Sequence, residues 1–146
     1  MAAVVIDIVD AIVAALDAVK ATLAIPFEVA KRSLPNYELP ELETAVLSVI
    51  PATVAITHAT RSMSYWDYRI DVAVQKRLDA TDRQTQIDTL VLLSQEVADE
   101  LIRVSFATTP ASSFLRCEID PLWVEDHLSE KRLFTSVVRL HYRVGR

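Results

Sequence analysis

The chain begins with a segment in which acidic residues recur at helical intervals. Within residues 4–23, Asp7, Asp10 and Asp17 are spaced by three and seven positions along one stripe, and apolar side chains occupy the rest of the surface. An unpaired buried carboxylate is strongly disfavoured. The pattern therefore predicts a helix whose acidic stripe faces solvent, a lumen or a basic partner, and which Pro26 ends.

Alternating apolar and polar positions predict strands along the middle of the chain. Residues 27–32 alternate weakly, residues 44–50 form a strand expected to stop at Pro51, and residues 54–60 form a separate strand. The clearest alternation covers residues 64–78. This last strand is expected to pair with the preceding one as an antiparallel hairpin.

The remaining pattern predicts the second half of the fold. The sequence favours a loop over residues 33–43, a helix over 83–104, a strand over 114–119 and a strand over 133–144. A connector with about one helical turn should fill residues 121–131. The expected fold is a single α+β domain over residues 1–146, with an antiparallel or mixed sheet of about five to six strands and two main helices on one face.

Charge is unevenly distributed, although the net charge is only −5. Residues 95–130 hold eight acids against Arg103 and Arg116, a net of −6, while residues 131–146 hold five basic residues and no acid. Arg139 and Arg143 should form a positive row on an exposed strand face. Opposed patches suit head-to-tail contacts between copies, and an ordinary mixed surface is the alternative.

Residue counts exclude several kinds of site. The one glycine is Gly145, so the chain holds no Walker A loop, no dinucleotide fingerprint and no nucleophile elbow. The one cysteine, Cys117, excludes an internal disulfide and a cysteine-rich zinc site. Its apolar neighbours predict a buried thiol rather than a nucleophile.

The remaining candidates for chemistry are isolated. His58 falls on the apolar face of its strand, as a core or interface histidine would, and His141 lies on the polar face of the last strand. Tyr65, Trp66 and Tyr68, which lie near arginines, could stack on bases, but they suit a core or a subunit contact better in an acidic chain. We therefore predict no catalytic, cofactor-binding or metal-binding residue, no cofactor and no enzymatic activity.

The apolar residues do not predict a membrane span. Residues 2–25 are strongly apolar but carry four charges, each of which costs about 2.5–3.5 kcal/mol at the centre of a membrane helix. No positively charged region precedes the apolar segment, so we do not expect a secretory signal. We expect synthesis in the cytoplasm. With 51% hydrophobic residues and a mean hydropathy of +0.25, the chain can have a spare apolar face for a partner.

Two stretches carry a resemblance to a known group of proteins. They are YRIDVAVQKRLDATDRQTQIDTLVLLSQEVADELIR, which begins at Tyr68, and LFTSVVRLHYRV, which begins at Leu133. Together with the long apolar first helix and the proline-rich stretch after it, they resemble small neck proteins of long-tailed bacteriophages, of the tail terminator and tail-completion type. The resemblance lies in the order of the elements and in their local sequence pattern, and it includes no chemical motif.

The resemblance implies a structural virion protein, made in the host cytoplasm and located in the tail or neck. Such a protein forms a ring, of six copies, that caps the tail tube, stops its growth and joins it to the head–tail connector. Its partners would be itself, the tail-tube protein, the connector protein and, in a contractile tail, the sheath protein. DNA would pass through without specific binding. The interface candidates are Arg139, Arg143 and the acidic stripe.

Two other hypotheses stay open at this point. One is a cytoplasmic α+β enzyme or ligand-binding dimer whose pocket uses scattered residues such as His58, Tyr68 and Glu118. The other is an intracellular regulator that binds a partner protein. A ring in solution favours the neck protein, and a compact dimer favours the first alternative.

Overall fold

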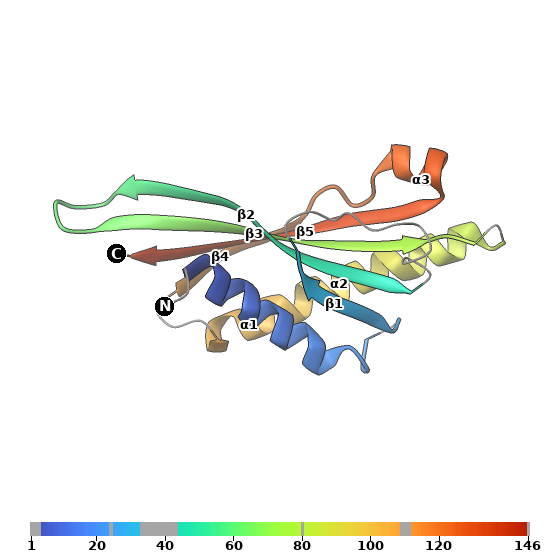
Figure 1. Ribbon diagram of the computed structural model, residues 1–146, viewed down its shortest axis with the longest axis horizontal. Coiled ribbons are helices and arrows are strands. Elements are labelled where there is room, and N and C mark those ends of the chain that lie inside the picture. The colour runs from blue at the N-terminus through green and yellow to red at the C-terminus, as the bar shows by residue number, and fades with distance from the viewer. Residues whose placement is uncertain (1–3, 24, 33–43, 80, 109–111, 146) are drawn as a thin grey trace.

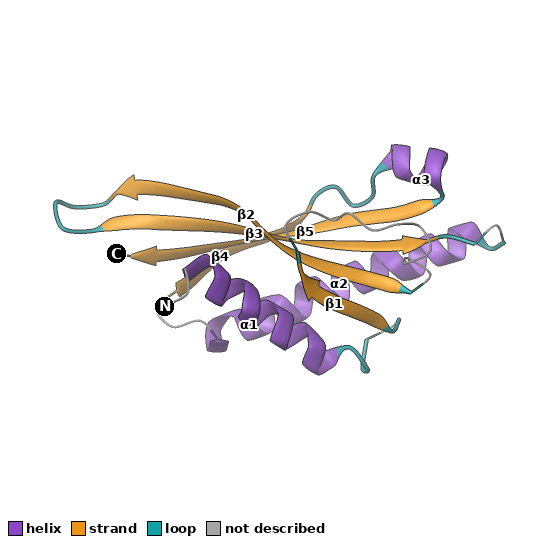
Figure 2. Ribbon diagram, viewed as in Figure 1, coloured by secondary structure: helices purple, strands orange, loops and turns teal. Residues whose placement is uncertain are grey.

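The computed structural model describes residues 4–23, 25–32, 44–79, 81–108 and 112–145. The elements in chain order are α1 (Val4–Val19), β1 (Phe27–Lys31), β2 (Ala45–His58), β3 (Ser64–Arg77), α2 (Arg83–Thr108), β4 (Ser112–Ile119), α3 (Glu125–Lys131) and β5 (Leu133–Gly145). The strands form one sheet in the order β1-β2-β3-β5-β4, with β1 parallel to β2 and all other neighbours antiparallel (Figures 1 and 2). The predicted α+β class, with a mixed sheet and two main helices, is confirmed.

The core lies between one face of the sheet and the helices α1 and α2, which run along that face (Figure 1). We call it the helix face. Alternate residues of β3 and β5, such as Val72 and Leu140, are fully buried there because strand side chains alternate between the two faces. Buried residues of the helices pack against this face: Ile8, Val9, Ile12 and Leu16 of α1, and Leu90, Leu93, Val97 and Leu101 of α2.

The sheet contains one correction to the predicted strands. Residues 44–50 and 54–60 were expected to be two strands separated by Pro51, but β2 runs through this proline from Ala45 to His58. The pairing of β2 with β3 shifts register between Pro51 and Thr53, so a bulge accommodates the proline. The pairing with β1 ends at Val49, which leaves Pro51 on an edge where no ladder hydrogen bond is lost.

The first helix is shorter than predicted, and the later elements agree better. We expected a helix over residues 4–23, but α1 ends at Val19, whose carbonyl accepts hydrogen bonds from the backbone N–H (2.9 Å) and the hydroxyl (2.8 Å) of Thr22. The hairpin of β2 and β3 and the final strand β5 are confirmed. The predicted loop over residues 33–43 lies outside the described residues.

The sheet extends well beyond the helices at one end. There the outer half of β2, the turn and the start of β3 project past the start of α1, and the end of β5 runs alongside them (Figure 1). We call residues 52–67 the arm, and the rest of the sheet together with α1 and α2 the body. Every residue from Ala52 to Met63 is exposed, because no described element packs over them.

The third helix covers part of the opposite face of the sheet, near the start of β5. The Nδ1 atom of His127 in α3 lies 2.8 Å from the hydroxyl of Thr135 in β5, which also accepts a 3.5 Å hydrogen bond from the amide of Gln75 in β3. The Val124 N–H donates to the Thr135 carbonyl at 3.0 Å. These contacts fix α3 at the end of the molecule far from the arm (Figure 2).

Candidate functional site

The opposite face of the sheet carries a compact group of charges, which we call the charged face. Strand alternation places them together, because residues paired across antiparallel strands share a face. Asp67 lies opposite Arg143, Arg69 opposite His141, and Asp71 opposite Arg139, while β4 adds partners to β5. The members are Asp67, Arg69, Asp71, Arg116, Glu118, Arg139, His141 and Arg143.

The best-formed ion pair of this face joins β5 to β3. Arg143 donates from Nε to Asp67 Oδ1 at 2.7 Å and from a terminal nitrogen to Oδ2 at 3.0 Å, a bidentate geometry. The guanidinium carbon also lies 4.6 Å from the ring centre of Tyr65. The hydrogen bonds from Arg143 hold the pKa of Asp67 below its usual value, and those to Asp67 raise the pKa of Arg143.

Three further ion pairs involve charges of this face. Arg69 Nε lies 3.3 Å from Asp71 Oδ1, and His141 Nε2 lies 3.3 Å from Glu118 Oε1. Arg139 lies 3.5 Å from a carboxylate oxygen of Asp120, just beyond the end of β4. Basic and acidic side chains therefore alternate across the strands, and their charges largely cancel.

This pairing changes two expectations about charge. Arg139 and Arg143 do share one face, as predicted, but each has a carboxylate partner within the chain, so they do not form an unbroken positive row. The acidic segment contains β4 and the basic segment contains β5, and these two strands pair with each other. Acidic side chains of β4 therefore lie beside basic side chains of β5, and their charges offset each other there. A role for the two arginines in an interface stays a prediction.

A cavity of about 230 Å³ opens beside the charged face, at the base of the arm. Its lining includes Thr53, Ala55, Asp67, Arg69 and His141. Catalysis by a general acid and base needs carboxylates or histidines in contrasting environments around a substrate. Here Asp67 forms an ion pair with Arg143, and Arg69 forms one with Asp71. We therefore interpret the lining as a polar surface whose ion pairs support the sheet.

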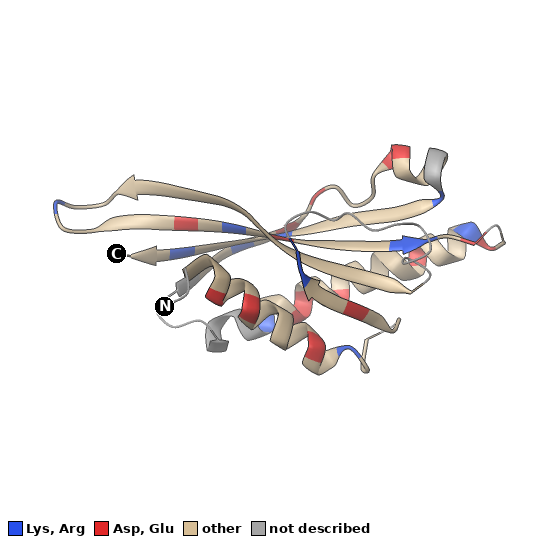
Figure 3. Ribbon diagram, in the orientation of Figure 1, with Lys and Arg blue, Asp and Glu red and all other residues tan. Residues whose placement is uncertain are grey.

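The acidic stripe of α1, whose positions are red in Figure 3, is exposed, as predicted. Asp10 Oδ1 lies 3.1 Å from Lys31 Nζ of β1, and Asp17 Oδ1 lies 3.1 Å from Lys20 Nζ. The sequence predicts that the stripe faces solvent, a lumen or a basic partner, and both of these lysine partners belong to the same chain. The use of the stripe as an interface stays a prediction.

The arm carries the most exposed large apolar side chain of the sheet, that of Ile56. Val54 is 43% exposed and Ile56 is 57% exposed, on the same face of the sheet as the core. Among the described residues, no strand pairs with the outer edge of β2 beyond Val49, and residues 52–60 contain no Asp, Glu, Lys or Arg. Edge strands usually carry charges that discourage pairing with another chain, so this edge is well suited to a contact.

A groove of about 370 Å³ lies between α2 and β4, and we call it the α2–β4 groove. Leu92 (47% exposed) and Ile102 (39%) contribute apolar surface to it. Its other lining residues are Gln95, Glu96, Ala98, Asp99, Cys117, Glu118 and Ile119. Burial, together with the nearby carboxylates of Glu118 and Asp99, raises the pKa of the Cys117 thiol to about 11. The expectation that this thiol is no nucleophile agrees with that value.

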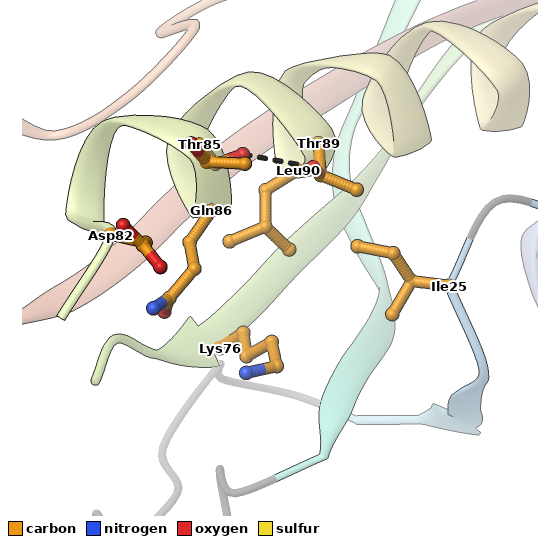
Figure 4. A pocket seen from close by; sticks show the side chains of 7 residues that line it. All are labelled: Ile25, Lys76, Asp82, Thr85, Gln86, Thr89 and Leu90. Carbon is orange, nitrogen blue, oxygen red and sulfur yellow. Dashed lines mark hydrogen bonds between the residues drawn. The ribbon is translucent and has the colours of Figure 1, made fainter.

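A smaller cavity of about 180 Å³ lies where α2 begins, lined by Ile25, Leu90 and five polar residues (Figure 4). The Gln86 side chain accepts from the Asp79 N–H at 2.9 Å and donates to the Thr81 carbonyl at 2.7 Å. Because the Gln86 side chain already bonds to the backbone just before α2, this cavity offers few polar groups that could orient a ligand.

The residues proposed for a scattered pocket are not brought together. His58 is exposed at the end of the arm, so its expected place in the core is wrong, although an interface role stays open. Tyr68 is buried on the helix face and Glu118 lies on the opposite face. The aromatic cluster is divided too, because Tyr65 and Tyr68 point to opposite faces of β3. In the described part of the chain, no group of three His, Cys, Asp or Glu could hold a metal ion.

Sequence reasoning missed the arm and the acidic partners of the charged face. The uncharged stretch of residues 53–60 was visible in the sequence, but dividing β2 at Pro51 concealed the length of the hairpin. No helix within the described ranges has both the length and the apolarity needed to cross a bilayer. The chain matches no protein-family model, and no curated protein matches it.

Proposed function

We propose that this chain is a structural subunit that assembles with copies of itself, as a ring that caps the tail tube of a bacteriophage and joins it to the head–tail connector. One observation carries the proposal: the arm projects from a well-packed body with exposed Val54 and Ile56 and a charge-free edge. A partner that covered these groups would remove apolar surface from water, at about 25 cal/mol per Å².

The body supports the same proposal through its lack of an evident reaction centre. On the charged face, Asp67, Arg69 and His141, which line the cavity at the base of the arm, are each engaged in an ion pair. The identity of the assembly, including the ring of six and the tail-tube, connector and sheath partners, rests on the sequence resemblance. The acidic stripe on α1 would repel the phosphate backbone if it faced the bore, which would let DNA slide.

The test combines mass and shape in solution. Light scattering after gel filtration, together with negative-stain imaging, should show rings of the purified protein, or rings that form when the tail-tube protein of the same virus is added. Ile56→Asp should abolish assembly, because it places a charge on the contact surface. Leu122→Asp is the matched control, since Leu122 is also exposed (38%) but lies near α3 at the other end. A wild-type protein that stays monomeric and does not bind the tube would contradict the proposal.

A further inference from the structure

The arm and the α2–β4 groove have complementary surfaces. The arm presents exposed Val54 and Ile56, with Met63 (36% exposed) in its turn. The turn also carries Arg61, and His58 ends β2 beside it. The end of the arm is therefore apolar on its helix-face side and basic at its tip (Figure 3).

The groove has the opposite character. Leu92 and Ile102 provide exposed apolar surface on α2, and Glu96 and Asp99 of the same helix add two acidic residues to the lining. That Glu118 and Asp99 raise the pKa of the Cys117 thiol agrees with a negative potential in this groove. A basic apolar segment would gain both apolar burial and favourable charge contacts here.

The arm cannot reach the groove of its own chain. It extends away from the body beyond the start of α1, whereas the groove lies along α2 and the inner half of β4 (Figure 1). A contact between two different patches on identical copies is head-to-tail, and repeated head-to-tail contacts close into rings when the rotation permits.

We propose that the arm of one copy seats in the α2–β4 groove of the next copy, with Ile56 against Leu92 and Ile102, and Arg61 facing Asp99. The proposal rests on the proposed function and adds the contact that would build the ring. It assigns the uncharged stretch of β2 and the exposed apolar residues of α2 to the two sides of one interface.

Cysteine pairs test the contact directly. Ser62→Cys places a thiol in the turn of the arm, and Gln95→Cys places one in the groove; both positions are exposed. Mixing the two single variants under mild oxidation, alone and with the tail-tube protein, should give disulfide-linked dimers that contain one chain of each variant. Each variant by itself should give at least about tenfold fewer dimers. The native Cys117 is a poor competitor because its pKa is about 11.

Two results of the cysteine experiment would overturn the inference. Efficient dimers from the Ser62→Cys variant alone would show an arm-to-arm contact. Rings that form without any cross-link between the two positions would show that another surface builds the ring. The second result would leave the proposed function standing, whereas a protein that forms no rings and does not bind the tube contradicts both.

A charge exchange gives an independent measurement. Arg61→Glu and Asp99→Arg should each weaken self-association about two- to fivefold, since exposed pairs are worth up to about 1 kcal/mol. The double variant should recover most of the wild-type affinity, because the exchanged charges attract again. Asp88→Arg is the matched control: Asp88 is exposed on α2 but does not line the groove, and its reversal should not be rescued by Arg61→Glu. Equal, additive losses in the double variant would show that the two residues do not meet.

Discussion

The body and the arm share the strands β2 and β3, but helices cover the sheet only in the body (Figure 1). In the body, Val72 of β3 and Leu140 of β5 have no exposed surface, because α1 and α2 pack over the helix face. In the arm, the same face of β2 leaves Ile56 57% exposed. The pairing of β2 with β3 runs through both regions, interrupted by the bulge between Pro51 and Thr53. Burial in this fold is therefore determined by what packs on the sheet and not by the strands themselves.

The difference suggests a division of work. The body holds enough buried apolar surface to keep the fold, and the arm contributes apolar surface that becomes useful only when another molecule covers it. Truncating an exposed side chain of such a surface should change the stability of the monomer little, but it can weaken the affinity of the complex strongly. Stability and assembly should consequently respond to different residues.

The largest expected effect concerns the core of the body. Phe134→Ala should lower the free energy of unfolding by about 3–5 kcal/mol, because Phe134 is fully buried and its removal leaves a cavity. Ile56→Ala in the arm should change it by no more than about 0.5 kcal/mol. Urea unfolding of the monomeric protein measures both. A large loss for Ile56→Ala would show that the arm is already covered in the monomer.

The second effect compares thiols in the two regions. At pH 8 a thiol with a pKa of about 11 is about 0.1% ionised, whereas an ordinary cysteine is about a quarter ionised. Cys117 should therefore react with an aromatic disulfide reagent about a hundredfold more slowly than the arm thiol of Ser62→Cys. Its rate should rise about tenfold per pH unit up to roughly pH 11. Equal rates at pH 8 would mean that the edge of the body around β4 opens readily.

The smallest effect concerns the ion pair at the junction of body and arm. Asp67→Asn should cost about 0.5–1 kcal/mol at neutral pH, a modest value because the side chains of Arg143 and Asp67 are 39% and 29% exposed. The folded pKa of Asp67 is lowered, so its contribution is complete above the unfolded value of about 3.9 and is lost as the pH falls through the folded pKa.

The measurement for this pair is the difference in unfolding free energy between wild type and Asp67→Asn across pH. It should be constant near neutrality and shrink in acid below about pH 4. Asp17→Asn, which removes the more exposed pair with Lys20, is the control and should change stability by less than about 0.5 kcal/mol. A loss that does not depend on pH would indicate that Asp67 acts through packing rather than charge.

Local patterns predicted the elements of this fold better than its surfaces. The alternation in β3 and β5 was long enough to identify both strands and their inward faces. The prediction of two strands separated at Pro51 was wrong because proline is tolerated within an edge strand. Whether a strand is an edge strand is known only once its neighbours in the sheet are placed. His58 was expected in the core or in an interface because its strand face is apolar, but the extent of the helices over the sheet decides whether that face is buried, and His58 is exposed.

The charges show the same limit. The acidic segment, residues 95–130, is followed directly by the basic segment, residues 131–146, and their different net charges suggested two opposed patches. Pairing of β4 with β5 brings Glu118 opposite Arg139, so a tertiary contact cancels what the linear distribution separates. Sequence alone could not supply the order β3-β5-β4, and the candidate interaction surfaces depend on that order.

The position of β5 has a consequence for how the protein folds. This strand lies between β3 and β4, and it pairs Tyr65 with Gly145 across most of the chain. Such long-range pairings are reached late and slowly, because the loop must close before any contact compensates for it. During synthesis, β3 and β4 would therefore leave the ribosome before their shared neighbour exists, with their edges unpaired. The uncharged edge of β2 adds to that exposure, so the nascent chain should need dilution or a chaperone until β5 is in place.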